Sequence, residues 1–220
     1  NINIKQHWIG FNSGEDEILF EEKDTQYDVN LRLSKSKRYM FISSESTNST
    51  EFLFIDFEDK RLEFHIILTR EKNHLYYPIQ YGDFFYILTN DDKNIEFKIV
   101  KSNIQSQNKK EWETIYLPNE GHTFENFTIV KNHLIILERN NVLPSFLIHN
   151  LETDSTYNVN FNEELYHMDF KDNFNMDADH FRFEYSSPTT PEIIYDYHLS
   201  TNELIQRHKQ KLNGDFHSDN

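Results

Sequence analysis

Four segments of the chain repeat one pattern of hydrophobic and polar positions. Each segment has an apolar run, then a polar turn, then a second apolar run that ends in acidic, Asn or Thr residues. The four copies are Arg38–Asp59, Asp83–Asn103, Asn132–Thr153 and Asp179–Thr201. Their starts lie roughly 45 to 50 residues apart, which is the period expected for the blades of a β-propeller.

Each copy is predicted to form a β-hairpin. Runs such as Phe84–Leu88 are short, aromatic and bounded by turn residues, as strands are. They are too short, and too rich in β-branched and aromatic residues, to indicate helices. Both faces of these runs are apolar, whereas an isolated antiparallel sheet keeps one polar face. We therefore expect each hairpin to be covered on both sides by its neighbours, as in a propeller.

A further strand is predicted on each side of every hairpin. The leading strands are Tyr27–Ser34, His74–Gln80, Phe124–Val130 and Leu165–Phe170, and the trailing strands are Phe64–Thr69, Trp112–Tyr116, Thr156–Phe161 and Glu203–His208. Near the start of the chain, Gln6–Phe11 is predicted to be the last strand of a preceding blade, and Ile18–Lys23 a short strand or loop. Trp8 and Trp112 are expected in the core of the blades.

The fold class expected is all-β: a partial β-propeller of about four four-stranded antiparallel blades. The blades are placed at approximately 24–70, 71–118, 119–163 and 164–211, followed by a linker over 212–220. A β-sandwich or an irregular antiparallel sheet is the alternative, and the fourfold recurrence of one hairpin favours the propeller. Since the first residue is not Met, we expect the chain to begin inside a longer protein.

The charge of the chain disfavours several classes of partner. The formal net charge is −15, whereas nucleic-acid binding needs a basic surface, and an anionic membrane surface is disfavoured for the same reason. No apolar run approaches the ~20 residues of a transmembrane helix, and Asn1–Gln6 has no signal-peptide character. The acidic surface suits a basic ligand, although solubility alone explains it. The absence of Cys fits a cytoplasmic location.

No segment has the pattern of a catalytic, cofactor or metal site. Ser13 stands three residues after Gly10, whereas a nucleophile elbow requires two. The segment Asn173–Glu184 has oxygen-bearing side chains at calcium-loop spacing, but Ala178 occupies the position that needs Gly. The 11 His residues do not form a helical zinc motif; His74, His133 and His149 are interpreted as ordinary strand or turn residues. We expect no catalytic residues, no cofactor and no metal ligands in this chain.

Several segments resemble the β-propeller of the prolyl oligopeptidase family of serine peptidases. Phe181–Pro191 and Ile194–Thr201 resemble its last blade, and further matches are Tyr27–Leu31, Lys35–Tyr39, His74–Tyr77, Phe85–Asn90, Trp112–Glu113 and Leu137–Arg139. The likeness covers nearly the whole chain in one order and is greatest for the oligopeptidase B, or protease II, branch. Pro188 departs from that branch, which usually has an apolar residue there.

The resemblance implies a seven-bladed propeller that caps an α/β-hydrolase domain, with this chain forming the last four blades. Leu212–Phe216 resembles the junction to that domain, and the family's catalytic Ser, Asp and His lie beyond it. The whole protein is then expected to hydrolyse short basic peptides after Lys or Arg, while the propeller restricts access by size. The alternative function is a free-standing, propeller-type module that binds a protein partner.

The alternation of antiparallel strands predicts which loops share one face of the blades. The turn between the second and third strands lies on the same face as the connection to the next blade, and the chain leaves its last strand on that face, near His208. The candidate contact with the hydrolase domain is therefore the loop of Ser186, Ser187, Pro188, Thr189, Thr190 and Pro191. The two prolines are expected to stiffen this loop. Uncovered blade faces also predict self-association.

Overall fold

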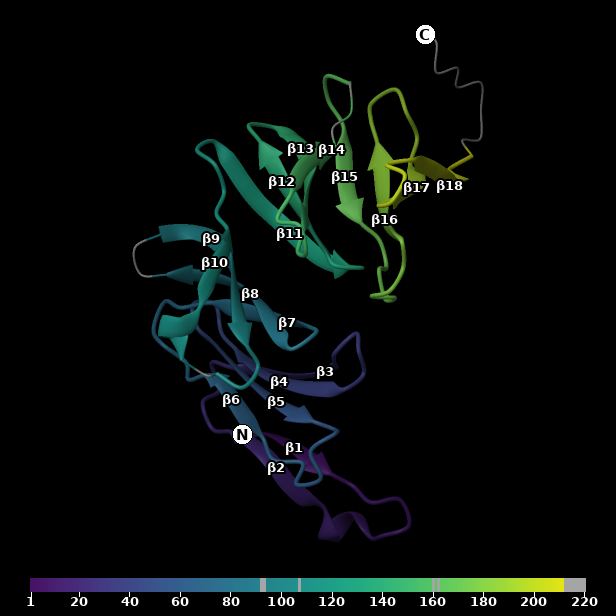
Figure 1. Cartoon of the computed structure of the whole chain (residues 1–220). Coiled ribbons are helices and arrows are strands. Elements are labelled where there is room, and N and C mark those ends of the chain that lie inside the picture. Colours follow the sequence, from purple (N-terminus) through teal and green to yellow (C-terminus); the bar gives the residue numbers. More distant parts are fainter. Residues whose placement is uncertain (92–93, 107, 160, 162, 212–220) are drawn as a thin grey trace. The chain divides into compact units, whose positions relative to one another are not determined.

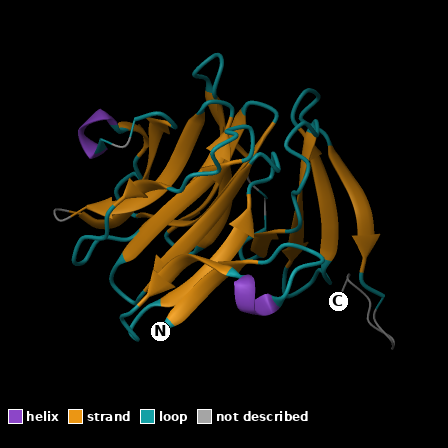
Figure 2. Ribbon diagram, turned by 90° about the horizontal axis from the view of Figure 1, so that it is seen from below, coloured by secondary structure: helices purple, strands orange, loops and turns teal. Residues whose placement is uncertain are grey.

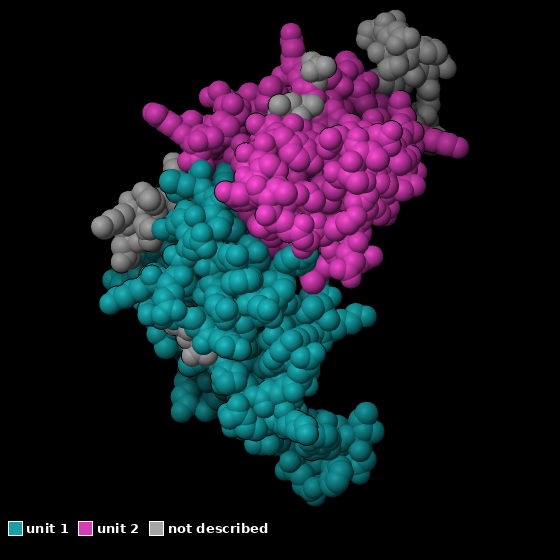
Figure 3. Space-filling view, viewed as in Figure 1, with its two compact units in different colours: residues 1–117 teal, residues 118–220 magenta. Residues whose placement is uncertain are grey.

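A computed structural model of the chain consists almost entirely of antiparallel β-strands (Figure 1 and Figure 2). It describes residues 1–91, 94–106, 108–159, 161 and 163–211. In this described part, the strands form one two-stranded sheet and four four-stranded sheets, and two short 3-10 helices cover Ser13–Glu15 and Lys109–Glu111. The chain divides into two compact units, residues 1–117 and 118–220 (Figure 3).

The first unit contains three of the sheets. Strands β1 (Ile2–Gln6) and β2 (Glu17–Glu22) form the two-stranded sheet. One four-stranded sheet consists of β3 (Asp28–Leu33), β4 (Tyr39–Glu45), β5 (Thr50–Asp56) and β6 (His65–Leu68). The other consists of β7 (Tyr76–Tyr81), β8 (Phe84–Asp91), β9 (Asn94–Asn103) and β10 (Glu113–Tyr116).

The second unit contains the remaining two sheets. One consists of β11 (His122–Val130), β12 (His133–Asn140), β13 (Leu143–Asn150) and β14 (Thr156–Val159), and the other of β15 (His167–Phe170), β16 (His180–Ser186), β17 (Ile193–His198) and β18 (Leu204–Lys209). In all four sheets the strands pair in chain order. The two central strands of each sheet are one of the four predicted hairpins.

Short turns fix the register of these strands. The β11–β12 turn consists of Lys131 and Asn132, whose φ angles are +42° and +59°, respectively.

 In the corresponding turn between β3 and β4, Lys37 also has a positive φ, of +62°. Consecutive positive φ angles at Lys131 and Asn132 are typical of a type I′ turn, whose twist matches that of a hairpin. Val130 therefore lies directly opposite His133, and the register of β11 and β12 is set from this end.

Each unit buries an aromatic core between its two four-stranded sheets. In the first unit, the ring of Phe85 lies 5.1 Å from Phe54 and 5.8 Å from Phe41, edge to face in both cases. In the second unit, the ring of Phe146 lies 5.0 Å from both Phe181 and Phe183, again edge to face. Such pairs contribute about 0.5–1.5 kcal/mol each beyond the burial of their surface. The aromatic residues of the hairpins therefore hold neighbouring sheets together.

The beginning of the chain differs from the prediction. The strand predicted over Gln6–Phe11 is wrong, because β1 ends at Gln6 and the Phe11 N–H donates to the Trp8 carbonyl in a turn, over 3.1 Å. Gly10 has φ +97° in this turn, which ends the extended conformation. The placement of Trp8 in a blade core is also wrong, since this residue is 62% exposed.

The partner of β1 is the segment that the sequence left as a short strand or loop. That segment forms β2, in which Phe20 lies opposite Ile4 of β1. The other tryptophan, Trp112, packs against the core of the first unit, as predicted. The linker predicted over 212–220, including Leu212–Phe216, lies outside the described residues.

Glu22, the last residue of β2, connects the two-stranded sheet to the sheet of β3–β6. Its carboxylate accepts hydrogen bonds from Ser44 Oγ (2.6 Å), Arg70 Nη2 (2.5 Å) and the backbone N–H of Asp24 (2.9 Å). Burial alone would raise the pKa of Glu22, but these hydrogen bonds and the charge of Arg70 lower it to about 2. The ionised form of Glu22 therefore stabilises the folded state.

We expect acid to remove this stabilisation. Because the folded pKa of Glu22 lies below its ordinary value of 4.5, the contribution is complete above that pH and is lost as the pH falls toward 2. Its size is on the order of 2–3 kcal/mol. Urea unfolding of the wild type and of Glu22→Gln should show a less stable variant at neutral pH and a smaller difference in acid. An equal difference at both pH values would contradict this prediction.

Candidate functional site

The candidate site lies along one edge of the second unit. Three segments meet there: the β12–β13 turn at Asn140–Leu143, the β14–β15 connection with Phe161 and Glu163–Tyr166, and the β16–β17 loop at Ser186–Pro191. Antiparallel strands alternate in direction, so these segments fall on the same edge of their sheets. The predicted interface loop is thus adjacent to the connection between the two sheets.

Glu163 holds the β16–β17 loop against this connection. Its Oε1 accepts a hydrogen bond from the Tyr185 hydroxyl at 2.6 Å and a longer one from the Thr190 hydroxyl at 3.5 Å. Hydrogen bonds from Ser187 and Tyr185 lower the pKa of Glu163 below its ordinary value, against the opposing effect of burial. The loop is therefore tied to the β14–β15 connection by one carboxylate.

The loop also closes on itself. The Thr190 N–H donates to the Ser187 carbonyl at 3.2 Å, and the Ser187 N–H donates to the Thr190 carbonyl at 2.9 Å. Ser187–Thr190 is thus a hydrogen-bonded β-turn with Pro188 at its second position, where the fixed φ of proline is favourable. This position explains how Pro188, the departure from the family pattern, is accommodated.

Removing the Glu163 carboxylate is expected to loosen this loop. In Glu163→Ala, the hydroxyls of Tyr185 and Thr190 lose their acceptor, at a cost of about 1–2 kcal/mol. Hydrogen exchange at the Ser187 and Thr190 amides should become at least several-fold faster. The matched control is Glu164→Ala, because Glu164 is the exposed neighbour in the same connection. The assignment fails if both variants change the exchange of these amides equally.

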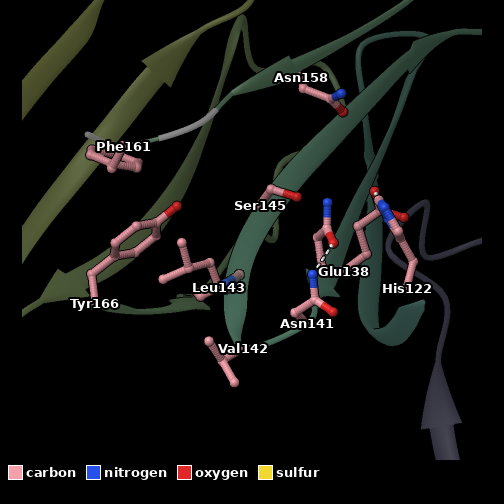
Figure 4. Close-up of a pocket in the computed structure, with 11 residues that line it drawn as sticks. His122, Glu138, Asn141, Val142, Leu143, Ser145, Asn158, Phe161 and Tyr166 are labelled. Atoms are coloured by element: carbon pink, nitrogen blue, oxygen red, sulfur yellow. Dashed lines mark hydrogen bonds and ion pairs between the residues drawn. The ribbon is translucent and has the colours of Figure 1, made fainter. Parts of the chain in front are cut away.

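An open hollow of about 550 Å³ lies on the same edge (Figure 4). Its lining residues come from β11, β12, β13, β14 and the β14–β15 connection; they are His122, Glu138, Asn140, Asn141, Val142, Leu143, Pro144, Ser145, Asn158, Phe161 and Tyr166. The rings of Phe161 and Tyr166 lie 4.5 Å and 5.6 Å from the ring of Tyr185. Since Tyr185 precedes the loop at Ser186, this aromatic cluster connects the hollow with the loop.

The polar side of the hollow contains a His–Glu pair, of which the glutamate is buried. His122 Nδ1 lies 2.9 Å from Glu138 Oε1, and Glu138 is only 3% exposed. An imidazole N–H at Nδ1 donates this hydrogen bond to the carboxylate oxygen, which fixes how the two side chains lie. The hollow therefore combines a carboxylate on one side with aromatic rings on the other.

The segments considered for chemistry have structural roles. Ser13 begins a 3-10 helix. In the segment Asn173–Glu184, the Asn173 side chain accepts from the Arg182 N–H at 2.7 Å and donates to the Arg182 carbonyl at 2.9 Å, so it closes the loop before β16. Among the described residues, no group of three or more His, Cys, Asp or Glu is placed to hold a metal ion.

The three histidines interpreted as ordinary residues have local partners. His74 Nε2 lies 2.8 Å from Thr89 Oγ1, His133 Nδ1 donates to the Lys131 carbonyl, and His149 Nε2 lies 3.0 Å from Asp154 Oδ1. Each of these contacts joins residues within one sheet or turn. In the described part of the chain, no helix is long and apolar enough to cross a membrane.

Consecutive four-stranded antiparallel sheets, each a meander, are the architecture of a β-propeller domain. Residues 1–210 match the N-terminal β-propeller domain of prolyl oligopeptidase. The chain therefore belongs to the prolyl oligopeptidase family, and both the predicted fold class and the resemblance are confirmed.

Two curated relatives are similar over most of this chain. Dipeptidyl aminopeptidase BI of Pseudoxanthomonas mexicana is 28% identical over 211 residues, which are 96% of this chain and 29% of that protein. Protease 2 of Moraxella lacunata is 24% identical over 199 residues, which are 90% of this chain and 28% of that protein. The chain thus spans less than a third of the length of either relative.

The solved structures with a similar fold include two oligopeptidases B. The enzyme from Trypanosoma brucei, with covalently bound antipain, has a TM-score of 0.89 and 23% identity, covering 99% of this chain and 32% of that one. The enzyme from Leishmania major has a TM-score of 0.89 and 19% identity, with the same coverage. The fold is therefore shared with these two structures over nearly the whole of this chain.

Proposed function

We propose that this chain is the non-catalytic propeller part of an oligopeptidase B-like serine endopeptidase. The observation that supports it best is the family match over residues 1–210, together with the similarity to protease 2 and the oligopeptidase B fold. In this proposal the chain supplies the last four of seven blades, and residues 212–220 lead to an α/β-hydrolase domain. The whole protein, in the cytoplasm, hydrolyses short peptides after Lys or Arg.

The chemistry of this proposal belongs to the hydrolase domain. A Ser activated by His, with Asp orienting the imidazole, attacks the peptide carbonyl, and backbone N–H groups stabilise the oxyanion. The propeller contributes no reacting group and limits access by size. The edge with the Ser186–Pro191 loop turns toward the hydrolase domain, and the Glu163 contact fixes the shape that the loop presents there.

A second candidate activity is that of a dipeptidyl aminopeptidase. The observation in its favour is the 28% identity with dipeptidyl aminopeptidase BI, which covers 96% of this chain. Both candidates place catalysis outside the chain. They differ in the substrate, since an aminopeptidase requires a free amino terminus and an endopeptidase does not.

The gene downstream of Asn220 provides the first test. We expect a Gly-x-Ser-x-Gly motif followed by Asp and then His, in the order of α/β-hydrolases. Their absence would overturn the peptidase proposal and favour a free-standing module that binds a protein partner.

Activity assays provide the second test. We expect this chain alone to leave peptides intact and to remain unlabelled by a fluorophosphonate probe, whereas the protein with its hydrolase domain should be labelled. The longer protein should cleave amino-blocked peptides after Arg or Lys. Cleavage restricted to unblocked dipeptidyl substrates would replace the first activity with the second. Stoichiometric labelling of the 220-residue chain would contradict its non-catalytic role.

A further inference from the structure

We propose that a second, smaller hollow of the second unit, beside the connection from β15 to β16, binds a hydrogen phosphate ion. This β15–β16 hollow has a volume of about 150 Å³. All of its lining residues except Asp172 belong to the segment Asn173–Glu184, which has the spacing of a calcium loop. Figure 1 shows the connection leading from the end of β15 into β16. The ligand is a small ion rather than a peptide, so this site goes beyond the proposed function and does not rest on it.

The size of the β15–β16 hollow favours a small ligand. Its volume of about 150 Å³ is below the range of roughly 300–1,000 Å³ found for the sites of drug-sized molecules. A peptide or an organic cofactor is therefore too large to be enclosed there, whereas a single polyatomic ion is not.

Arg182 gives the β15–β16 hollow its positive charge. This arginine lines the hollow and donates from Nε (2.7 Å) and Nη2 (3.0 Å) to Asp196, which also accepts from Arg207 Nε at 2.6 Å. One buried carboxylate balances only one of the two guanidinium groups, so the three side chains together retain one positive charge. In the part of the chain that the structure describes, Arg182 Nη1 has no partner. Guanidinium N–H groups in this fixed arrangement suit the oxygens of an anion.

The position of Arg182 is fixed at both ends. The Asn173 side chain accepts from the Arg182 N–H at 2.7 Å and donates to the Arg182 carbonyl at 2.9 Å. At the other end, Asp196 is fully buried, while the Arg182 side chain is 42% exposed. The guanidinium group is thus held from below and accessible from the hollow, so little side-chain entropy is lost when an anion binds.

Two further side chains in the lining can donate hydrogen bonds. The Asn175 side-chain oxygen accepts from the Asp177 N–H at 3.0 Å, which leaves its NH₂ group to donate toward a ligand. His180 also lines the hollow, and its Nε2 lies 3.5 Å from Asp196 Oδ2, beside the Arg182 guanidinium. A metal ion is disfavoured here because the permanent charge of Arg182 repels it.

Asp172 distinguishes hydrogen phosphate from other anions. It is the one carboxylate in the lining, and an ionised carboxylate accepts hydrogen bonds but donates none. Hydrogen phosphate has an O–H group that can donate to Asp172, whereas sulfate and carboxylates have none at neutral pH and are repelled. The net charge of −15 acts against all anions alike and is screened beyond about 8 Å at physiological salt. The selectivity therefore arises within the hollow.

Titration of the chain with inorganic phosphate tests this proposal, with sulfate as the comparison and sodium chloride holding the ionic strength constant. The readout is the chemical shifts of the backbone amides at neutral pH. We expect saturable shifts with phosphate at Asn175, His180 and Arg182. Sulfate should bind at least tenfold more weakly, because it has no proton to donate to Asp172. The absence of a saturable shift with phosphate, or equal binding of the two ions, would overturn the proposal.

Asp172→Asn tests the origin of the selectivity. A carboxamide removes the repulsion of sulfate and can donate a hydrogen bond to it, so the ratio of phosphate affinity to sulfate affinity should fall about tenfold. Asp177→Asn is the matched control, since Asp177 is an exposed carboxylate of the same connection that does not line the hollow. An unchanged ratio in Asp172→Asn, or an equal change in both variants, would show that Asp172 does not select the ion.

Arg182→Lys tests the guanidinium group. Lysine keeps the charge but not the planar arrangement of donors, so phosphate affinity should fall at least several-fold. The control is Arg139→Lys, because Arg139 pairs with Glu125 at 2.7 Å elsewhere in the second unit and does not line this hollow. If Arg182→Lys does not fold, Asp172→Asn decides the matter, since Asp172 is exposed. Wild-type phosphate affinity in a folded Arg182→Lys would contradict the assignment.

The outcomes are independent of the proposed function. Phosphate binding is measured on this chain without peptide or cleavage, so a missing hydrolase motif downstream would remove the peptidase proposal and leave the titration valid. Conversely, a peptidase whose propeller shows no saturable shift with phosphate would retain its activity and lose only this site.

Discussion

Replacing Phe146 with alanine is expected to lower the free energy of unfolding by about 3–5 kcal/mol. Phe146 lies in β13, is fully buried, and has its ring 5.0 to 5.1 Å from those of Phe170, Phe181 and Phe183. These three rings are fixed on β15 and β16, so they cannot move far enough to fill the cavity. The loss therefore combines the burial of one large side chain with the cost of the remaining void.

Urea unfolding followed by far-ultraviolet circular dichroism measures this change. Both tryptophans lie in the first unit, so tryptophan fluorescence serves as a separate report on that unit. Phe174→Ala is the matched control, because Phe174 is 77% exposed and such surface changes usually stay within about 0.5 kcal/mol. Similar losses in both variants would show that Phe146 is not the centre of the core.

The second large effect is expected at Asp196. This fully buried carboxylate of β17 accepts hydrogen bonds from Arg182 Nε (2.7 Å) and Nη2 (3.0 Å), and from Arg207 Nε (2.6 Å). Burial alone would raise the pKa of Asp196, but these two arginines and nearby His180 lower it. Arg207 lies on β18, whose residues are all exposed. Asp196 thus fixes an outer strand that has little apolar burial of its own.

We expect Asp196→Asn to lower the free energy of unfolding by about 2–4 kcal/mol, since removing one member of a buried ion pair leaves its partners uncompensated. Arg207→Gln should cost only about 1 kcal/mol, because Arg207 is partly exposed and the two bonds from Arg182 remain. Asp154→Asn is the control at an exposed carboxylate. Unfolding curves that rank Arg207→Gln at or above Asp196→Asn would contradict this account.

The pH dependence of the Asp196 effect has a definite sign. Because the folded pKa lies below the ordinary value of 3.8, the ionised carboxylate stabilises the folded state above that pH and loses this effect as the pH falls further. The difference between wild type and Asp196→Asn should therefore be largest near neutral pH and shrink in acid. A difference that grows in acid would show that Asp196 is protonated in the folded state.

The four hairpins could be predicted from the sequence because their signal is local. Each apolar run and the polar turn after it lie within about twenty residues, and the run length distinguishes a strand from a helix. The recurrence of this unit then indicated blades, since one hairpin with two apolar faces needs covering on both sides. The residues that resemble the family lie within the same segments, so the fold and the family followed from one set of positions.

The first strand could not be placed from the sequence with the same reasoning. The apolar residues Trp8, Ile9 and Phe11 gave a stronger signal than the alternating Ile2 and Ile4, but a turn with positive φ at Gly10 leaves them exposed. The pairing of β1 with β2 decides which of these residues are extended. Such pairing depends on a partner more than ten residues away, and periodicity within one run contains no information about it.

The candidate site, too, could be predicted from the sequence only in part. The Ser186–Pro191 loop and the connection that contains Glu163 were predicted on one edge, since strand alternation alone places them there, but the contacts of Glu163 with Tyr185 and Thr190 were not predicted. The His122–Glu138 pair depends on the register of β11 and β12, which shifts at an irregularity between Phe124 and Asn126. The sequence by itself determined the strands of the four-stranded sheets, their order along the chain and the family. Only the tertiary structure decided which side chains meet, because contacts between separate strands depend on register and on irregularities that local hydrophobic patterns do not specify.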